Sequence, residues 1–442
     1  MVRLTSTVVA SATTLLLAAP TLASETLQDK LATTAASVTE DVIALRRHFH
    51  EFPELSNEEY KTAERIAEEL RAMGLEPTTG IAETGVTALI KGGKPGPLVA
   101  LRADMDALPV IEQVDLPFAS KQRGVYNGND VGIMHACGHD THMAMLLGAA
   151  QTLVAHQDEL PGDVLLIFQP AEEGAPHGTP SWGAKKMLEE GIFDERKPDA
   201  IFGLHTFANL PAGMVAYRSG PAMASSDRFS ITVSGRQTHG SRPWNGVDPI
   251  VVASQIVMAV QTIASRQVDV TKAPSVISFG IINGGVRNNI IPDTVELVGT
   301  IRNFDMGIRE QIHAKLRHTA VTIADSAGAS AEVNIDLGYP VTVNNEDLTA
   351  QMLPTVQRVF GDGRVLESPL VTGAEDFSYF AQETPGLFLF LGGAPEGADP
   401  AQIATNHSPL FFVDESTLPY GVNVLAQMVA DFMIDATTSS GD

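Results

Sequence analysis

The sequence has 442 residues, 44% of them hydrophobic, which is enough for two or three domains with a sizeable core. Acidic side chains outnumber basic ones by 53 to 29, and the resulting net charge of −24 argues against nucleic acid or an anionic membrane as a partner. The charge does not restrict a small-molecule substrate.

Residues 1–23 have the pattern of a secretory signal peptide. Arg3 precedes an apolar run that ends near Pro20, and small residues favour cleavage after Ala23. We therefore expect an exported protein, with the periplasm favoured over the medium. A membrane anchor is the alternative, but the run is short and rich in Ser and Thr, and we expect no membrane insertion after cleavage.

Two amphipathic helices are predicted next. Apolar residues recur at helical spacing over residues 41–47 and 61–70. The intervening segment 48–56 is predicted to be a loop, and His48 and His50 are interpreted as ordinary loop residues because no second ligand lies near them in the sequence.

Strands are predicted at residues 87–90 and 98–106. The second is continuously apolar until it reaches Asp104 and Asp106, as expected for a strand buried on both faces of an α/β sheet. Its carboxyl end therefore delivers two carboxylates to one edge of the sheet.

Residues 134–142 combine three imidazoles, a carboxylate and the only cysteine of the chain. Cys137 and His139 flank Gly138, which allows a tight turn, and thiolate and imidazole suit zinc or its first-row neighbours. A helix is expected to begin here, and its dipole would help to hold Cys137 as a thiolate. A lone cysteine cannot form a disulfide within the chain, which favours a metal ligand over a plain core turn.

Two more buried strands, at residues 164–168 and 200–204, also lead into polar groups. Glu172 and Glu173 follow the first, and His205 follows the second. Open α/β sheets bind ligands beyond the carboxyl ends of their strands, so these groups can converge with Cys137 and His139. Of two adjacent carboxylates, one can bind metal while the other acts as a general base toward water.

From residue 217 the pattern changes to a smaller α+β unit. Strands are predicted at 229–233, 275–280, 294–302 and 331–335, with helices at 248–265 and 306–327, in β-α-β-β-α-β order. Three notable positions lie in this unit, His239, Asn289 and Arg302, although each could be a plain loop or strand feature.

After residue 339 the first pattern resumes. A helix near 348–360, a strand at 386–393 and a final helix at about 415–434 are predicted, with a loose tail at 437–442. His407, in a loop after the strand, is a candidate last ligand. The prediction is an α/β catalytic domain, residues 24–216 and 339–442, with a mixed, mainly parallel sheet flanked by helices. Residues 217–338 would interrupt it as an inserted dimerisation or lid domain.

Six motifs stand in order along the chain: RADMDALP (102–109), HACGHDTH (135–142), QPAEEG (169–174), GLH (203–205), TGAEDF (372–377) and NHSP (406–409). Together they resemble the zinc aminoacylase/carboxypeptidase family of metallopeptidases. They are most similar to its amidohydrolase branch, which includes hippurate hydrolase, N-acyl amino acid hydrolases and indoleacetyl-amino-acid hydrolases. The resemblance covers essentially everything after the signal peptide.

The resemblance implies two divalent metal ions per subunit, zinc or manganese, with cobalt and nickel as alternatives. Cys137 would bridge both ions as a thiolate. The remaining ligands would be His139 and His205 for one ion, and Glu173 and His407 for the other.

The resemblance also implies roles for the other candidates. Glu172 would be the general base and acid, and Asp104 or Asp106 would orient a ligand from behind it. His239 would polarise the scissile carbonyl, often from the partner subunit of a homodimer formed through residues 217–338. The substrate carboxylate would be held by Asn289 and Arg302.

The implied reaction cleaves the amide bond of an N-acyl amino acid, such as a hippurate-like substrate, to a carboxylic acid and a free amino acid. A carboxypeptidase or dipeptidase acting on short peptides is the alternative, since only pocket shape separates the two. A non-catalytic exported binding protein is a more distant alternative, against which an intact Glu172 argues. The acyl group, the amino acid and the metal are not fixed by the sequence.

Overall fold

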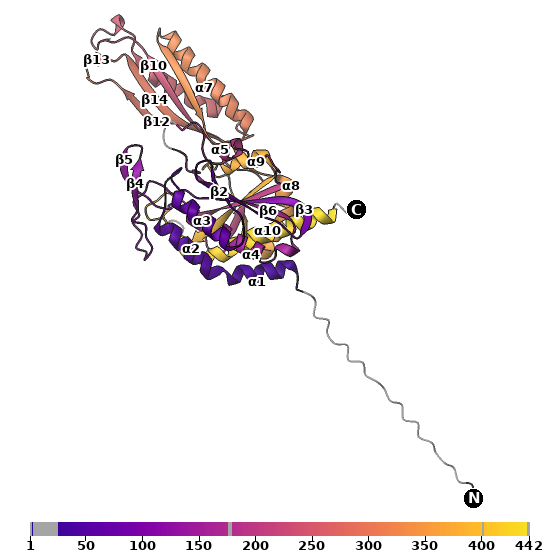
Figure 1. Cartoon of the computed structure of the whole chain (residues 1–442). Coiled ribbons are helices and arrows are strands. Elements are labelled where there is room, and N and C mark those ends of the chain that lie inside the picture. Colours follow the sequence, from indigo (N-terminus) through magenta and orange to yellow (C-terminus); the bar gives the residue numbers. More distant parts are fainter. Residues whose placement is uncertain (1, 3–24, 176–178, 400–401, 440–442) are drawn as a thin grey trace.

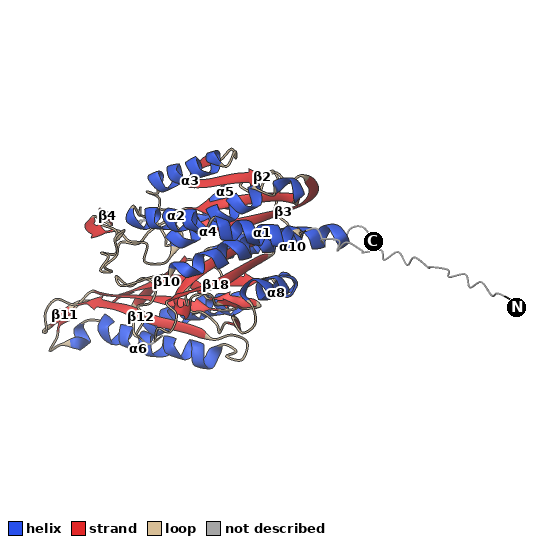
Figure 2. Ribbon diagram, turned by 90° about the horizontal axis from the view of Figure 1, so that it is seen from below, coloured by secondary structure: helices blue, strands red, loops and turns tan. Residues whose placement is uncertain are grey.

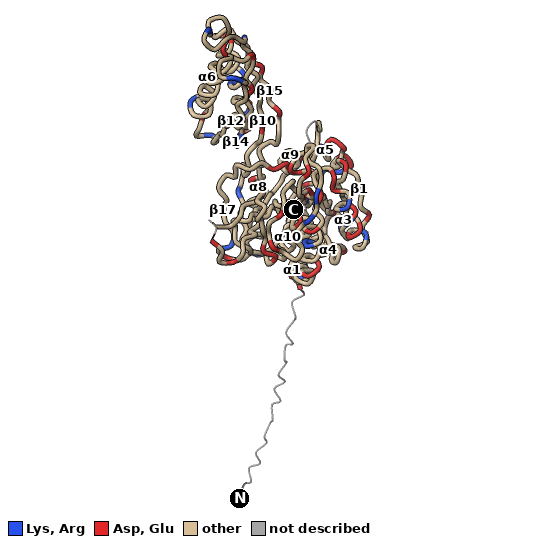
Figure 3. Tube along the Cα trace, turned by 90° about the vertical axis from the view of Figure 1, so that its left-hand side faces the viewer, with Lys and Arg blue, Asp and Glu red and all other residues tan. Residues whose placement is uncertain are grey.

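The computed structural model describes residues 2, 25–175, 179–399 and 402–439. Apart from residue 2, the predicted signal segment 1–23 lies outside these described residues. Figure 1 shows a larger unit of helices packed on a sheet, and a smaller elongated unit that projects from it. Figure 3 shows acidic and basic positions on both units, but residues 217–338 hold 10 acidic and 11 basic side chains, so the net charge of −24 belongs to the rest of the chain.

The larger unit contains an 8-stranded sheet. In spatial order its strands are β1 (Thr78–Ile81), β2 (Gly85–Ile90), β6 (Pro161–Gln169), β3 (Lys94–Asp104), β7 (Ala200–Pro211), β18 (Gly386–Ala394), β8 (Val215–Tyr217) and β17 (Val365–Glu367). Neighbours from β6 to β18 pair in parallel, as do β8 and β17, and the other pairs are antiparallel. The predicted mixed, mainly parallel sheet is therefore confirmed.

Helices cover both faces of this sheet (Figure 2). One face packs against α1 (Leu27–Ser37), α2 (Thr39–Glu51), α3 (Tyr60–Ala72), α4 (His139–Val154), α8 (Glu346–Phe360) and α10 (Leu418–Ser439). The other face packs against α5 (Gly183–Glu189) and α9 (Phe377–Glu383). Short 3-10 turns form η1 (Gln157–Glu159) and η4 (Glu415–Thr417). Helix α4 is buried almost all round, so its first turn is fixed in the interior.

The smaller unit is an antiparallel 4-stranded sheet with two helices on one face. Its elements, in chain order, are β10 (Ser225–Ser234), α6 (Pro249–Thr262), β12 (Ser275–Gly284), β14 (Thr294–Asn303), α7 (Met306–Ser326) and β15 (Ser330–Leu337). Alternate residues of β10 are buried against the helices, as the period of a strand covered on one face requires. The order is the predicted β-α-β-β-α-β.

Three small two-stranded sheets complete the fold. They pair β4 (Arg123–Tyr126) with β5 (Asn129–Gly132), β9 (Gly220–Met223) with β16 (Thr342–Asn344), and β11 (Thr238–His239) with β13 (Ile290–Ile291). The chain leaves the large sheet after β8 and returns through β16, so the smaller sheet lies within the predicted insert. The boundaries at 217 and 338 stay predictions.

Helix α6 continues as a π-helical turn, η3 (Ile263–Gln267). Among the described residues, the segment Pro249–Gln267 has the length and apolar composition of a membrane span, with a mean hydropathy of 1.2. Its inner face packs in the core of the smaller unit, and only 33% of the segment is buried. Its outer face is thus both apolar and exposed.

Candidate metal centre

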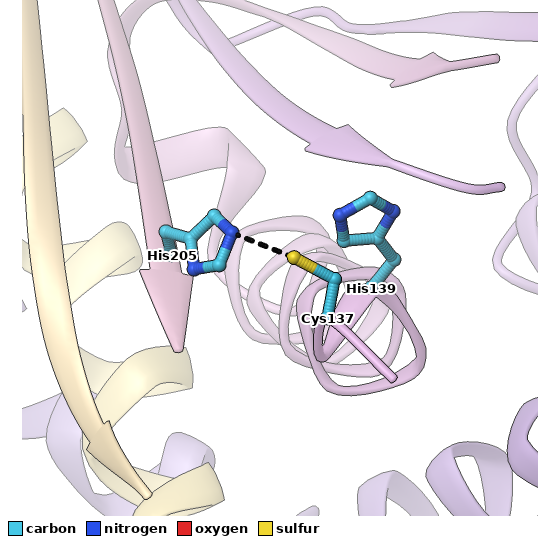
Figure 4. A group of neighbouring side chains, drawn as sticks. All are labelled: Cys137, His139 and His205. Carbon is cyan, nitrogen blue, oxygen red and sulfur yellow. Dashed lines mark hydrogen bonds between the residues drawn. The ribbon is translucent and has the colours of Figure 1, made fainter. Parts of the chain in front are cut away.

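Cys137 and His139 lie on either side of Gly138, at the start of α4. Gly138 has a φ of +105°, in the left-handed region that favours glycine, and a Cβ there would lie 3.3 Å from Cβ of Thr206. This tight turn lets the thiol and the imidazole reach the same side of the helix start (Figure 4).

His205 approaches the thiol from β7. Its Nε2 lies 3.3 Å from Sγ of Cys137, and the metal-binding atoms of Cys137, His139 and His205 all lie within 4.8 Å of one another (Figure 4). The predicted strand ended at residue 204, which is wrong: β7 continues to Pro211 because it remains paired with β18 beyond that point. His205 is therefore held inside a strand rather than in a loop.

Glu173 and His407 form a second group around the same thiol. Nε2 of His407 lies 3.3 Å from Sγ of Cys137 and 3.2 Å from Oε1 of Glu173. The His407 backbone is held in the left-handed region, with φ +71°, by a 2.7 Å hydrogen bond from its N–H to the oxygen of Ala136. Cys137 thus belongs to two triads, one with His139 and His205 and one with Glu173 and His407.

The hydrogen bonds in these triads leave ligand atoms available for metal. Nδ1 of His139 lies 2.8 Å from the backbone oxygen of Asp106 and donates to it, and its Nε2 has no hydrogen-bond partner among the described residues. Nδ1 of His205 likewise donates to the oxygen of Thr206 at 3.0 Å. Oε1 of Glu173 lies 3.2 Å from Nε2 of His407 but makes no well-aligned hydrogen bond in the described part of the chain. Thiolate, imidazole and carboxylate together suit zinc and its first-row neighbours, so these residues fit a pair of divalent ions.

The electrostatics of the pocket favour a cation among its acidic groups. Burial raises the pKa of the Cys137 thiol well above its usual value, and the Glu173 and Glu172 carboxylates raise it further. The contribution of the α4 dipole to the thiolate stays a prediction, and a divalent ion bound here would stabilise the thiolate much more strongly. Burial also lowers the pKa of His205 well below its usual value, which keeps this imidazole neutral, as metal binding needs.

Glu172 lies beside the triads and has a carboxyl suited to proton transfer. Its Oε2 lies 3.9 Å from Nε2 of His139, and its Oε1 lies 3.4 Å from the backbone nitrogen of Asp376. Burial raises the pKa of this carboxyl well above its usual value, and Glu375 and Glu173 raise it further. Such a group can take up and return a proton near neutral pH.

The two aspartates predicted to orient ligands differ in what they contact. Asp106 accepts the backbone N–H groups of Glu172 and Glu173, each at 3.0 Å, and its backbone oxygen fixes the His139 ring. Asp104 instead bonds Nδ1 of His142 at 2.6 Å and lies 3.7 Å from Nε2 of His139. Asp106 therefore holds His139 and the turn that carries both glutamates, whereas the Asp104 carboxylate bonds His142, which belongs to neither triad around Cys137.

The structure brings one of the three small-unit candidates to the pocket. Arg302 lines a cavity of about 440 Å³ together with Cys137, Glu172, Glu173, His205, Phe207, Met223 and His407. His239 and Asn289 are not among its lining residues. They lie side by side at the two-stranded β11–β13 sheet: His239 is in β11, and Asn289 directly precedes β13. The N–H of Gly240 donates to the oxygen of Asn289, and the exposed His239 ring contacts Ser241.

Other residues that organise the pocket were not predicted. Asn406 donates to the backbone oxygens of Cys137 and Thr206, both at 2.9 Å, and so ties together the segments that carry three candidate ligands. The Tyr339 hydroxyl donates to the backbone oxygen of Glu172. Asn406 and Tyr339 are both far in sequence from the residues that they contact. Of the two, only Asn406 lies in a predicted motif, NHSP at 406–409.

A buried ionic cluster supports the floor of the site. The guanidinium of Arg102 is fully buried and donates to Asp104 at 2.8 Å, Glu375 at 2.9 Å and Asp376 at 3.0 Å. The RADMDALP and TGAEDF motifs contain these residues, but their spacing alone does not reveal that they meet. Their contact fixes Asp104 and the segment that borders Glu172.

The prediction that His48 and His50 lie in a loop is wrong. Both lie in the last turn of α2, which runs to Glu51 because residues 45–49 pack on the core. His50 is buried and bridges Asp140, at 2.8 Å, and Glu112, at 3.0 Å. It therefore supports the first turn of α4 and contacts no candidate ligand of the triads.

The chain is similar to known proteins over most of its length. The family model described as peptidase family M20/M25/M40 matches residues 100–431. Thermostable carboxypeptidase 1 of Saccharolobus solfataricus is 42% identical over 92% of this chain and 99% of its own. N-acetyl-L-cysteine deacetylase of Bacillus subtilis is 40% identical over 87% of this chain and 86% of its own.

A solved structure agrees with these relatives. The Bacillus subtilis YXEP protein, described as a dinuclear metal-binding peptidase of the M20 family, superposes with a TM-score of 0.74 at 33% identity. The match covers 90% of this chain and 99% of that one.

Proposed function

The chain belongs to the peptidase family M20/M25/M40 and is a metal-dependent hydrolase of linear amides, and from this premise we propose that its substrates are N-acyl amino acids. The products would be a carboxylic acid and a free amino acid, with hippurate-like compounds among the substrates. The observation that carries the proposal is a pocket in which both metal triads, the buried Glu172 and the guanidinium of Arg302 border one cavity.

The two triads would hold two divalent ions, through Cys137, His139 and His205 on one side and Cys137, Glu173 and His407 on the other. When bound, these ions supply Lewis-acid polarisation of the carbonyl and lower the pKa of water. We propose zinc or manganese, with cobalt or nickel also compatible with this donor set.

Residues of the chain itself transfer the proton and bind the substrate. Glu172 takes a proton from the attacking water and returns it to the leaving amine, a role supported by its raised pKa. Arg302 holds the carboxylate of the amino acid by charge-assisted hydrogen bonds. The cavity also has an apolar wall, Phe207, Met223 and Val371, which can receive the acyl group. His239, in β11, stabilises the oxyanion, and Asn289, next to β13, contacts the substrate carboxylate.

For His239 to reach a pocket, we propose a homodimer formed through residues 217–338. Two exposed surfaces of the smaller unit support it. On the outer face of α6, Val251 is 53% and Met258 72% exposed, and on the edge strand β12, Ile281 is 53% and Ile282 64% exposed. An unpaired edge strand beside an apolar helix face suits association with a second copy. Light scattering that finds a fully active monomer would refute the dimer.

Export is proposed on residues 1–23 alone. Cell fractionation and N-terminal sequencing of the mature chain test it: a periplasmic product that starts at Ser24 is expected. A full-length product retained in the cytoplasm would contradict it.

A carboxypeptidase or dipeptidase is the second candidate function. It is favoured by the 42% identity to a protein named thermostable carboxypeptidase 1. Both candidates use the same metal pocket and Arg302, and they differ in the group that fills the apolar wall.

Free amino acid release from a panel of substrates separates the two. The panel contains N-acetyl, N-benzoyl and indoleacetyl amino acids and matched dipeptides, tested with zinc-loaded and manganese-loaded enzyme. We expect higher kcat/KM for the acylated compounds. Preference for dipeptides would establish the peptidase instead, and absence of release from every compound would reject both.

A further inference from the structure

The turn that carries Glu172 and Glu173 is fastened by two buried carboxylates. The N–H of Ala171 donates to Oε1 of Glu59 at 2.9 Å. The next two N–H groups, of Glu172 and Glu173, donate to the two carboxylate oxygens of Asp106, each at 3.0 Å. Three successive backbone donors therefore have side-chain acceptors from two other parts of the chain.

The turn needs such fastening because its first residue is strained. Ala171 has a φ of +51°, in the left-handed region that a residue with a Cβ rarely adopts, and it is fully buried. A strained conformation persists only when its surroundings hold it. The next residue along the chain is Glu172, so relaxation of Ala171 would reorient both glutamates.

Glu59 is built into the interior to make this contact. Its side chain is 0% exposed, and it comes from the short segment before α3, far from the turn in sequence. Its second oxygen accepts the hydroxyl of Thr84 at 2.6 Å. Glu59 does not line the cavity, so it has no access to substrate.

We propose that Glu59 is a positioning residue that holds the turn at Ala171 and thereby places both Glu172 and Glu173. The inference rests on the proposed function for Glu172 as the base and Glu173 as a metal ligand. Loss of the Glu59 acceptor would misplace both groups together, which a purely structural role in the core would not do.

The charge of Glu59 is not required for this role. Burial raises the pKa of Glu59 to about 8, and the nearby Asp106 adds to the effect. Glutamine reproduces the shape of this side chain, its acceptor for Ala171 and its polar contact with Thr84. Methionine has the same length but no such acceptor.

The test compares Glu59→Gln with Glu59→Met in the full metal-loaded enzyme. Glu59→Met is expected to lower kcat on the order of 10²-fold with little change in KM, because the base is displaced. It is also expected to weaken metal affinity about 10- to 100-fold in a chelator competition, because Glu173 moves with the turn. Glu59→Gln is expected to retain both kcat and metal affinity.

Glu54→Met is the matched control. Glu54 lies in the same segment and also accepts a backbone N–H and a hydroxyl, both of Thr62, at 2.8 and 3.0 Å, but it caps α3 and does not reach the turn. This variant is expected to lower Tm while leaving kcat and metal affinity unchanged. Equal losses of kcat in Glu54→Met and Glu59→Met would overturn the proposal, as would wild-type kcat and metal affinity in Glu59→Met.

Two further points keep the test decisive. If Glu59→Met does not fold, Thr84→Val is tested instead, because it removes the hydrogen bond that Thr84 donates to Glu59. A smaller loss of kcat and of metal affinity is expected for this variant. Wild-type kcat and metal affinity in Thr84→Val would overturn the proposal. Metal affinity is measured without substrate. Weakened affinity in Glu59→Met therefore supports the positioning role even if no acyl amino acid is cleaved, in which case the proposed function alone fails.

Discussion

The metal pocket and the two-stranded β11–β13 sheet carry the two groups of candidate catalytic residues, and they are built in opposite ways. In the pocket, Cys137, His139 and His205 are 6%, 0% and 7% exposed, and hydrogen bonds to the backbone fix both rings. In the β11–β13 sheet, His239 is exposed and its Nδ1 is hydrogen-bonded to Ser241, and the nearby Trp244 is 76% exposed. The first region gathers its candidate ligands from one chain, whereas the second presents side chains that line no part of the described cavity.

This difference separates what one chain can do from what requires two. The pocket holds both candidate ligand triads and the proposed base within one chain. The proposed roles of His239 and Asn289 require the β11–β13 sheet to reach a pocket. In the proposed dimer, the β11–β13 sheet of one subunit would reach the pocket of the other.

The largest effect is expected inside the pocket. Glu172→Gln removes the proton acceptor but keeps the size and most contacts of the side chain, so kcat should fall about 10³-fold. Metal content, measured by atomic absorption, should be unchanged because Glu172 belongs to neither ligand triad around Cys137. Retained turnover would remove Glu172 from its role as the base.

A large effect is also expected from substitution of His239, in the β11–β13 sheet. His239→Ala should lower kcat about 10²-fold through loss of one donor to the oxyanion. If His239 acts in the partner's pocket, mixing the inactive Glu172→Gln and His239→Ala chains restores one complete site in each heterodimer. Random exchange would then return about a quarter of wild-type activity. No recovery after verified subunit exchange would show that His239 does not act across the dimer.

Arg302 lies between the two regions, because it belongs to the smaller unit but lines the cavity. Arg302→Ala should raise KM about 10- to 100-fold for substrates with a free carboxylate, since a charge-assisted contact is lost. Arg302→Lys should recover only part of this, because lysine lacks the two-pronged geometry. Substrate amides without the carboxylate serve as the control, and an equal rise in their KM would contradict the assignment.

The smallest effect on activity is expected from the ion cluster of the smaller unit. Burial alone would raise the pKa of Asp227, but hydrogen bonds from Arg309 and His313 outweigh it and lower the pKa to about 2. A lowered folded-state pKa stabilises the fold above the unfolded value near 3.8, and the contribution is lost as the pH falls toward 2. Asp227→Asn should therefore cost about 2 kcal/mol at pH 7 in urea unfolding, and progressively less below pH 4.

The matched control for this cluster is Asp336→Asn. Asp336 pairs with Arg228 in the same unit, but the two side chains are 52% and 56% exposed, so almost no change in stability is expected. Neither substitution should change kcat. Equal destabilisation by both, or a constant cost of Asp227→Asn between pH 7 and pH 3, would contradict the account.

The sequence predicted most of the elements and many pocket residues because these leave local signals. Continuous apolar runs mark the buried strands, and polar groups at strand ends mark the edge where Glu172, Glu173 and Asp106 meet. The β-α-β-β-α-β order of the smaller unit follows from periodicity alone. The end of β7 was missed because its pairing with β18 depends on residues nearly two hundred positions away.

The residues that position the site left no such signal. Glu59, Tyr339 and Asn406 each act on a backbone group of a distant segment, and a single side chain in a loop does not reveal which backbone it will meet. The strain at Ala171 was equally hidden, since nothing in the sequence around it requires a left-handed residue there. Contacts of this kind appear only when the fold is known.

The most direct test of the account counts the metal ions held by Cys137, because this thiol belongs to both triads. Zinc or manganese is titrated calorimetrically into the chelator-stripped wild-type enzyme, Cys137→Ala, His205→Ala and His407→Ala. We expect two tightly bound ions per chain in the wild type and one in each histidine variant. Cys137→Ala should bind no ion tightly. Two tightly bound ions in Cys137→Ala, or a single ion in the wild type, would contradict a dinuclear centre built on a shared thiolate.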